Sequence, residues 1–203
     1  VEAQRRAGVQ IATFVAQGLD GSIIPTAVNI SNVPPEVMDK FGADVLRLWV
    51  SSVDYSHDVS ISDEILKQVS DAYRKFRNSL RFVLGSLDDY DDSKAVTSWD
   101  ELEPVDRYMM AKTYAMLRSV EKAYDEYKYN TVYRECYDFV NELSSVYLDI
   151  TKDRLYSEAP DSPRRRAAQT VLANVLEVLV RVLTPIISFT CDEVWEHYPQ
   201  GMA

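Results

Sequence analysis

The amino-acid sequence predicts an all-α protein, an up-and-down bundle of four to five helices. Beyond residue 61, apolar residues recur every three or four positions over long stretches, the spacing that places them on one face of a helix. Only 6 Gly and 8 Pro occur among 203 residues, and 46% of the residues are hydrophobic, which is typical of a globular helical protein. The helical stretches follow one another through short links, and such links join antiparallel neighbours in a bundle.

The first part of the chain differs from the rest. The stretch Ala7–Asp39 contains no Lys or Arg, and Gly, Asn and Pro residues interrupt its weak apolar runs. We interpret residues 1–33 as strand and loop or as a poorly ordered arm. Pro34-Pro35 is a natural boundary, because a residue that precedes proline avoids helical geometry. Residues 36–41 then suit a short helix that ends at Gly42.

Residues 43–53 contain an apolar run that is too short for periodicity to distinguish a helix from a buried strand. Residues 53–61 combine turn-forming residues with alternating apolar ones, so we expect a connector that has room for one strand.

The first of four long helical patterns covers residues 62–87, and Ser62 or Asp63 can cap its start. We expect the acidic run that follows it, residues 88–92, to be a solvated turn. The apolar face predicted for this helix consists of Ile65, Val69, Tyr73, Phe76, Leu80, Val83 and Leu87.

The second pattern covers residues 104–127, and Pro104 suits the first turn of a helix. The third covers residues 131–155, with Asn130 as the expected cap. It has the clearest apolar stripe of the chain, formed by Val132, Cys136, Phe139, Leu143, Val146 and Ile150.

The fourth pattern begins at Ser162-Pro163, a cap followed by proline in the first helical position. We expect Pro185 to kink or end it. A short helix over residues 186–197 then completes the bundle.

The overall charge of −10 argues against a protein that binds nucleic acid through its net charge, because phosphate-binding proteins are usually basic. Any RNA-binding surface must be a local basic patch on an acidic body. Net charge bears on solubility and long-range steering and says little about the fold.

The two cysteines, Cys136 and Cys191, and the two histidines do not have the spacing of a metal site, so we expect no metal. Nothing indicates a disulfide framework, and we therefore expect a cytoplasmic protein. No apolar run reaches the roughly 18 residues of a membrane span, and the start of the chain lacks the layout of a signal peptide.

The first long helix carries a second face. Helical spacing places Arg74, Arg77, Asn78 and Arg81 within one strip, clear of the apolar face. Arginine provides a planar set of donors for phosphate oxygens, and asparagine provides a donor and an acceptor for a base edge. This combination suits an RNA backbone with one or two unstacked bases. The alternative is a solvated helix flank whose arginine stems cover the edge of the core.

Two further basic segments are candidates. Lys152 and Arg154 lie near the end of the third helix, where the helix dipole favours cations with or without a ligand. Arg164, Arg165 and Arg166 lie in the first turn of the fourth helix, where positive charge opposes the dipole unless an anion approaches. The alternative for these three arginines is ion pairing with the acidic surface.

Several motifs together resemble the class I aminoacyl-tRNA synthetases, most closely the isoleucyl members. The motifs are Gly42-Ala43-Asp44 with Leu46-Arg47-Leu48-Trp49, Tyr73-Arg74-Lys75 with Arg77-Asn78 and Leu80-Arg81-Phe82, the Lys152–Tyr156 element and the Asp192–Glu196 segment. The resemblance covers about residues 34–198. It implies a helix over residues 43–53, in a region that braces the tRNA stem side of the catalytic domain. Asp44 and Arg47 are close enough in sequence that we also expect a local ion pair between them.

The resemblance implies an anticodon-binding domain that grips the anticodon stem-loop of an isoleucine tRNA. The implied tRNA contacts are Arg74, Lys75, Arg77, Asn78, Arg81, Lys152, Arg154, Arg164, Arg165 and Arg166. We expect three parts: residues 1–33 as a remnant or linker replacing the catalytic-loop region, residues 34–61 as a stem-contact connector, and residues 62–203 as the helical anticodon-binding domain.

The catalytic motifs of that family are not found in this sequence. The His-Ile-Gly-His element is absent, and residues 21–29 stand where the Lys-Met-Ser-Lys-Ser loop is expected, without a lysine. We therefore expect no catalytic residue, cofactor or activity in this chain alone. The resemblance implies ATP and Mg²⁺ as cofactors of the intact ligase and its catalytic domain as a partner.

Two alternatives remain open. One is the anticodon domain of a valyl or leucyl synthetase, although the Arg47–Ser56 stretch fits the isoleucyl members better. The other is a helical scaffold that binds a partner protein and no RNA, which the acidic balance favours and the arginine strip disfavours.

Overall fold

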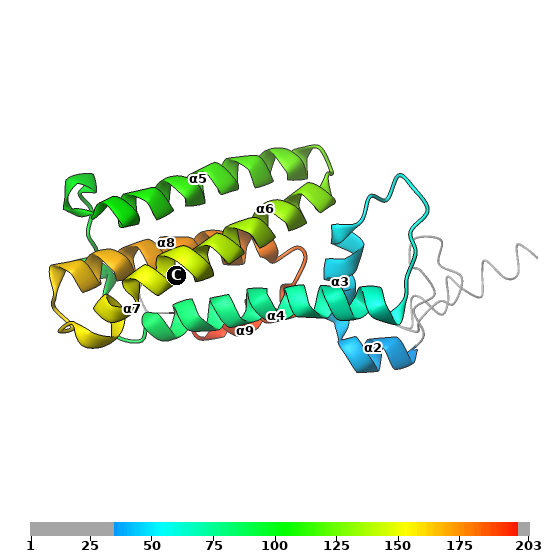
Figure 1. Cartoon of the computed structure of the whole chain (residues 1–203), viewed down its shortest axis with the longest axis horizontal. Helices are drawn as coiled ribbons and strands as arrows, with labels where there is room; N and C mark the ends of the chain where they lie inside the picture. The colour runs from blue at the N-terminus through cyan, green and yellow to red at the C-terminus, as the bar shows by residue number, and fades with distance from the viewer. Residues whose placement is uncertain (1–34, 199–203) are drawn as a thin grey trace, which may run out of the picture. The chain divides into compact units, whose positions relative to one another are not determined.

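The chain is built from helices joined by turns and loops (Figure 1). The computed structural model describes residues 35–198, and within them there is no strand. The helices are α2 (Pro35–Phe41), α3 (Ala43–Ser52), α4 (Asp63–Ser86), α5 (Pro104–Asp125), α6 (Tyr129–Glu142), α7 (Leu148–Ser157), α8 (Pro163–Leu183) and α9 (Ser188–Glu196). The prediction of an all-α helix bundle is confirmed, and so is the choice of helix over strand for α3.

The chain divides into two units, Val1–Lys40 and Phe41–Ala203. The expectations for residues 1–33, including the replaced catalytic loop, lie outside the described residues. The boundaries predicted for residues 34–61 and 62–203 stay predictions. Among the described residues, no helix is long and apolar enough to span a bilayer, and no His, Cys, Asp or Glu side chains gather in threes as metal ligands would.

Helix α8 is the central helix of the second unit, in contact with α4, α5, α7 and α9. Three consecutive residues, Val171, Leu172 and Ala173, are all buried, although they point to widely separated sides of the helix. A helix that is apolar around most of its circumference must be enclosed by other helices. Its start agrees with the prediction, since the Ser162 hydroxyl accepts a hydrogen bond from a first-turn amide and Pro163 follows.

A turn of π-helix, Leu143–Tyr147, interrupts the third predicted helix between α6 and α7. A π turn inserts an extra residue and so rotates the helix face that follows it. Val146 and Ile150, predicted on the buried stripe, are consequently 39% and 53% exposed, whereas Tyr147 is fully buried. The stripe predicted for this helix is correct through Leu143 and wrong at Val146 and Ile150.

Three other local predictions need correction. Residues 53–61 form turns and bends, and their backbone has no neighbouring strand among the described residues with which to pair. Asn130 is not a cap, because α6 already begins at the preceding residue without a side-chain cap. The apolar face predicted for α4 also differs from the buried one: Leu66 and Ala72 are buried although they were not predicted, and Ile65 is only half-buried. The buried face is wider than predicted because α4 contacts α3, α6, α8 and α9.

Asp44 and Arg47 of α3 hold the junction between α8 and α9. The buried Asp44 carboxylate accepts hydrogen bonds from the backbone amide and the hydroxyl of Thr190, at 2.8 and 2.7 Å. That amide lies in the first turn of α9, where the helix dipole favours a negative charge. Arg47 donates to the carbonyl oxygens of Pro185 and Ile186, at 2.6 and 2.9 Å. The predicted ion pair between the two side chains is therefore replaced by contacts to the α8–α9 junction.

A buried polar network joins the start of α5 to α7 and α8. The Asp106 carboxylate, fully buried, accepts hydrogen bonds from the Tyr147 hydroxyl at 2.7 Å and from Arg154 Nη1 at 3.0 Å. Arg154 Nη2 contacts the Glu103 carboxylate at 2.5 Å, and Arg164 Nε reaches the same carboxylate at 2.6 Å. Burial, and then the neighbouring Asp106 charge, raise the pKa of Tyr147 well above its usual range, so this tyrosine stays a hydrogen-bond donor.

We expect Arg154→Ala to lower the free energy of unfolding by about 3–5 kcal/mol, because it leaves the buried Asp106 carboxylate without its charged partner. Urea denaturation followed by circular dichroism would measure this loss. Arg164→Ala is the matched control: its side chain is 58% exposed, and its removal should change stability little. Equal effects of the two substitutions would contradict the structural role assigned to Arg154.

Candidate nucleic-acid interface

The cationic strip predicted from the sequence lies along the exposed side of α4. We define the α4 strip as Arg74, Lys75, Arg77, Asn78 and Arg81, all of which are exposed. Steps of three and four residues hold most of these side chains on one flank of the helix. The opposite side of α4 is buried against neighbouring helices, and the strip therefore faces solvent.

Two arginines of the α4 strip make exposed ion pairs. Arg74 lies 2.7 Å from Asp71, with both side chains about two-thirds exposed. Arg77 donates to the Glu193 carboxylate of α9 at 2.9 Å and to the Tyr73 hydroxyl at 3.5 Å. The Tyr73 hydrogen bond and the Glu193 charge raise the pKa of Arg77 despite some desolvation, so it stays charged. Exposed pairs of this kind are weak in water, and a phosphate can compete for the arginine.

The other members of the α4 strip are more open. Lys75 donates to the Asn141 side-chain oxygen at 2.9 Å and lies 5.1 Å from the centre of the Tyr137 ring, which ties it to α6. Asn78 and Arg81 have no hydrogen bond or ion pair from their side chains within residues 35–198. Carboxylates therefore do not sequester the strip as a whole, and Arg81 offers all its donors to solvent.

The two basic residues of α7 have different surroundings. Lys152 pairs with Asp149 at 2.8 Å, and both side chains are at least half exposed. Arg154 is only 6% exposed, and its terminal nitrogens are engaged by Asp106 and Glu103. Its guanidinium is enclosed by two carboxylates inside the protein, and the sequence-based assignment of Arg154 to the tRNA contacts stays a prediction.

The three arginines at the start of α8 are occupied by acidic partners. Arg164 pairs with carboxylates of Glu103 and Glu158, at 2.6 and 3.0 Å. Arg165, whose side chain is 16% exposed, reaches both carboxylate oxygens of Asp89 at 2.9 Å, and Arg166 donates to the Asp89 carbonyl oxygen. The alternative of ion pairing with the acidic surface describes Arg164 and Arg165, whereas the printed bonds of Arg166 go to a backbone carbonyl and to the Gln169 side chain. Asp89 is correspondingly part of this cluster, and not of a simple solvated turn.

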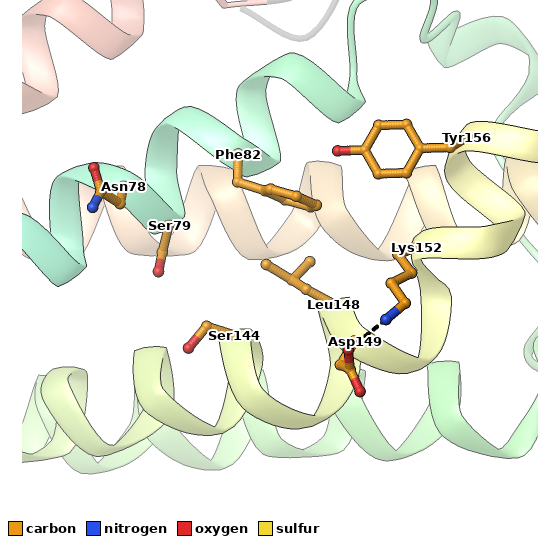
Figure 2. A pocket seen from close by; sticks show the side chains of 8 residues that line it. All are labelled: Asn78, Ser79, Phe82, Ser144, Leu148, Asp149, Lys152 and Tyr156. Carbon is orange, nitrogen blue, oxygen red and sulfur yellow. Dashed lines mark hydrogen bonds and ion pairs between the residues drawn. The ribbon is translucent and has the colours of Figure 1, made fainter.

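A groove of about 330 Å³ opens beside the α4 strip, between α4 on one side and the π turn with α7 on the other (Figure 2). Asn78 of the strip and Lys152 of α7 line it together with two aromatic residues, Phe82 and Tyr156. Sequence reasoning identified Asn78 and Lys152 separately and missed the aromatic pair. The sequence contains one sign that Tyr156 belongs to this site: it follows Lys152 by four residues, so the two side chains share one face of the helix.

Comparison with known proteins gives a consistent picture. Residues 106–202 match the family described as the anticodon-binding domain of tRNA ligases. The chain is 51% identical, over 184 residues, to the isoleucine–tRNA ligase of Halalkalibacterium halodurans, and 52% identical, over 193 residues, to that of Geobacillus kaustophilus. These alignments cover 89% and 95% of this chain but only 20% and 21% of the relatives. The chain thus spans about a fifth of the length of the curated relatives that it matches.

A solved structure with a similar fold is a leucyl-tRNA synthetase from Agrobacterium radiobacter K84, determined in a ternary complex with tRNA and LeuAMS. The likeness has a TM-score of 0.63 at 19% identity and covers 83% of this chain and 20% of the synthetase. At that identity the comparison concerns the fold of the helices.

We expect Asp89→Asn to destabilise the chain at pH 7, and the difference from the unsubstituted protein to shrink as the pH falls below 3.8. Desolvation raises the pKa of Asp89, but the Gln169 hydrogen bond and the charge of Arg165 outweigh it and hold the pKa below its usual 3.8. The stabilisation by the charged form is therefore complete above the usual pKa and lost as the pH falls through the lowered one. Urea denaturation at several pH values would measure the difference, with the neighbouring Asp88→Asn as the control, because Asp88 is exposed and has no ion pair within residues 35–198.

Proposed function

We propose that this chain, which belongs to the isoleucine–tRNA ligase family over the region that it spans, binds the anticodon stem-loop of an isoleucine tRNA. The family match supports an anticodon-binding domain, and the identity to isoleucine–tRNA ligases favours the isoleucyl reading over a valyl or leucyl one. The structural observation that carries the proposal is the α4 strip, an exposed row of cations with an amide among them on an otherwise acidic protein.

The chemistry of the α4 strip suits RNA in two ways. Arg74, Arg77 and Arg81 supply guanidinium groups, which contact phosphate oxygens through one or two hydrogen bonds and position the nucleic acid. Asn78, between them, supplies a donor and an acceptor of the kind that reads a base edge. Lys152, across the groove, adds a cation from a second helix. We propose these residues and Lys75 as the tRNA contacts of this chain.

The remaining basic candidates do not enter the proposed contact set. Arg154 is required inside the protein, and Arg165 is largely buried against Asp89. Arg166 donates to the loop before α5, and Arg164 bridges two glutamates. An RNA that approached Arg154 or Arg164 would have to displace two carboxylates from each, whereas at the α4 strip it displaces at most one from each arginine.

Our proposal assigns binding to this chain and catalysis to the remainder of an intact ligase. There, ATP and Mg²⁺ would serve the activation of isoleucine, and the catalytic domain would be the partner that receives the acceptor end of the tRNA. Such an enzyme works in the cytoplasm. We expect the 203-residue chain alone to bind tRNA without aminoacylating it.

We expect Arg81→Glu to weaken binding of an isoleucine tRNA transcript about tenfold or more, because it replaces an unpaired cation by a charge that repels phosphate. The slope of the logarithm of affinity against the logarithm of salt concentration should also fall by about 1. Fluorescence anisotropy at two or more salt concentrations would measure both quantities. A substitution at Arg81 tests RNA binding more directly than one at Arg77. A glutamate at position 77 would face Glu193 and disturb the contact between α4 and α9.

Arg118→Glu is the matched control, because Arg118 is also exposed and has no ion pair in the described residues, but it lies on α5. It should leave the affinity and the salt dependence nearly unchanged. Equal binding of isoleucine and valine tRNAs would argue against isoleucine specificity. The absence of salt-dependent binding to either tRNA would instead favour a protein-binding scaffold, the alternative that the charge of −10 suggests.

A further inference from the structure

We infer that Tyr73 is a positioning residue, which fixes the Arg77 guanidinium for a phosphate of the RNA. Tyr73 is itself held by a chain of hydrogen bonds that leads through Thr190 to the buried carboxylate of Asp44. The chain joins three helices, because Asp44 belongs to α3, Thr190 to α9 and the other two residues to α4. This inference rests on the proposed function and assigns a role within it to residues that lie behind the α4 strip.

The direction of each hydrogen bond in the chain follows from its buried end. The Asp44 carboxylate can only accept, and it accepts from the Thr190 hydroxyl at 2.7 Å. Because that hydroxyl has donated its proton to Asp44, it accepts the bond from the Tyr73 hydroxyl, at 2.8 Å. The Tyr73 oxygen keeps its acceptor capacity, and Arg77 Nη1 donates to it at 3.5 Å. The chain therefore runs from an exposed cation to a buried anion, and each bond polarises the next.

The buried end of the chain is firmly anchored. Asp44 is 6% exposed and Thr190 is 2% exposed. The same carboxylate also accepts hydrogen bonds from the backbone amides of Thr190 and Phe189, at 2.8 and 3.3 Å, in the first turn of α9. Tyr73 is half-buried, and its hydroxyl is held to this anchor through Thr190. The oxygen atom that Arg77 contacts therefore has a fixed place beside α4.

The other two arginines of the α4 strip have no such support. Arg74 pairs with Asp71 of the same helix, with both side chains about two-thirds exposed. Arg81 has no hydrogen bond or ion pair from its side chain within residues 35–198. An unsupported arginine loses rotamer freedom when it binds a phosphate, whereas a side chain that is already fixed loses less. Fixing Arg77 in advance thus strengthens its contact with RNA without adding a new contact.

The chain leaves Arg77 able to bind an anion. Arginine carries several N–H donors, of which one goes to Tyr73 and another, on Nη2, goes to the Glu193 carboxylate at 2.9 Å. Both side chains of the Arg77–Glu193 pair are about half exposed, so the pair is weak and a phosphate can replace the carboxylate. The bond to Tyr73 uses the other terminal nitrogen and need not break. Glu193 therefore occupies the anion position of Arg77 in the free chain.

The test uses the full chain and an isoleucine tRNA transcript, with affinity measured by fluorescence anisotropy. Tyr73→Phe keeps the ring and removes the hydroxyl, and it should weaken binding about 2- to 10-fold, the range for losing one hydrogen bond. In an Arg77→Gln background, Tyr73→Phe should cause no further loss, because no guanidinium is left to position. In an Arg74→Gln background the loss should reappear, since Arg74 is not part of the chain. A merely structural role of Tyr73 would not depend on Arg77 in this way.

Two further measurements examine the chain itself. Thr190→Val removes the hydroxyl between Tyr73 and Asp44 and should weaken binding as Tyr73→Phe does, whereas Thr190→Ser keeps the hydroxyl and should restore the affinity. In nuclear magnetic resonance spectra of the free chain, the Nε–H group of Arg77 should have a higher order parameter than that of Arg74. Tyr73→Phe should remove this difference.

Unchanged affinity of Tyr73→Phe, or an equal loss with and without the Arg77 side chain, would overturn the inference. Equal order parameters of Arg77 and Arg74 in the unsubstituted chain, or full affinity of Arg77→Gln, would also contradict it. If Arg81→Glu weakens binding and Tyr73→Phe does not, only this inference fails. If the unsubstituted chain binds no RNA, the proposed function fails as well.

Discussion

The rest of the structure depends on the buried carboxylate of Asp106. A charge without solvent must be matched by donors, and here the Tyr147 hydroxyl and the Arg154 guanidinium provide them from the π turn and α7. Because Arg154 has to point inward, Lys152 and Tyr156, two residues before and after it, project from the other side of α7 and share one face. An internal electrostatic requirement thus decides which side chains α7 presents to the groove.

The same logic explains how a chain of net charge −10 can carry an RNA-binding surface. Charges separated by more than about 8 Å are largely screened at physiological salt, so the acidic surface elsewhere has little influence at a local contact. The basic residues sort into two groups. Arg154 is buried and Arg165 half-buried, each against a carboxylate, and both stabilise the fold, whereas Arg74, Arg77 and Arg81 are exposed and at most weakly paired. Local pairing, more than the count of cations, separates structural arginines from available ones.

The sequence predicts most of the fold and about half of the site. Helix positions follow from apolar spacing and from caps such as Ser62 and Ser162, which act within one turn of the chain. The pairing of Arg165 with Asp89 and the contacts of Asp44 with Thr190 depend on how distant helices meet, and no local pattern specifies them. For that reason the strip on α4 is predictable from one helix, whereas a groove that requires Phe82 and Tyr156 from two helices is not.

The π turn between α6 and α7 contributes both to the buried network and to the groove, through Tyr147 and Ser144 respectively. In an uninterrupted α-helix, Val146 and Ile150 would continue the buried stripe. The π turn leaves these two side chains partly exposed, while Tyr147 is buried and bonded to Asp106. π turns are often found at functional sites, but this one has a sufficient internal reason, since it satisfies a buried carboxylate. The π turn is therefore no independent sign of a ligand, and the case for RNA rests on the exposed cations of the α4 strip.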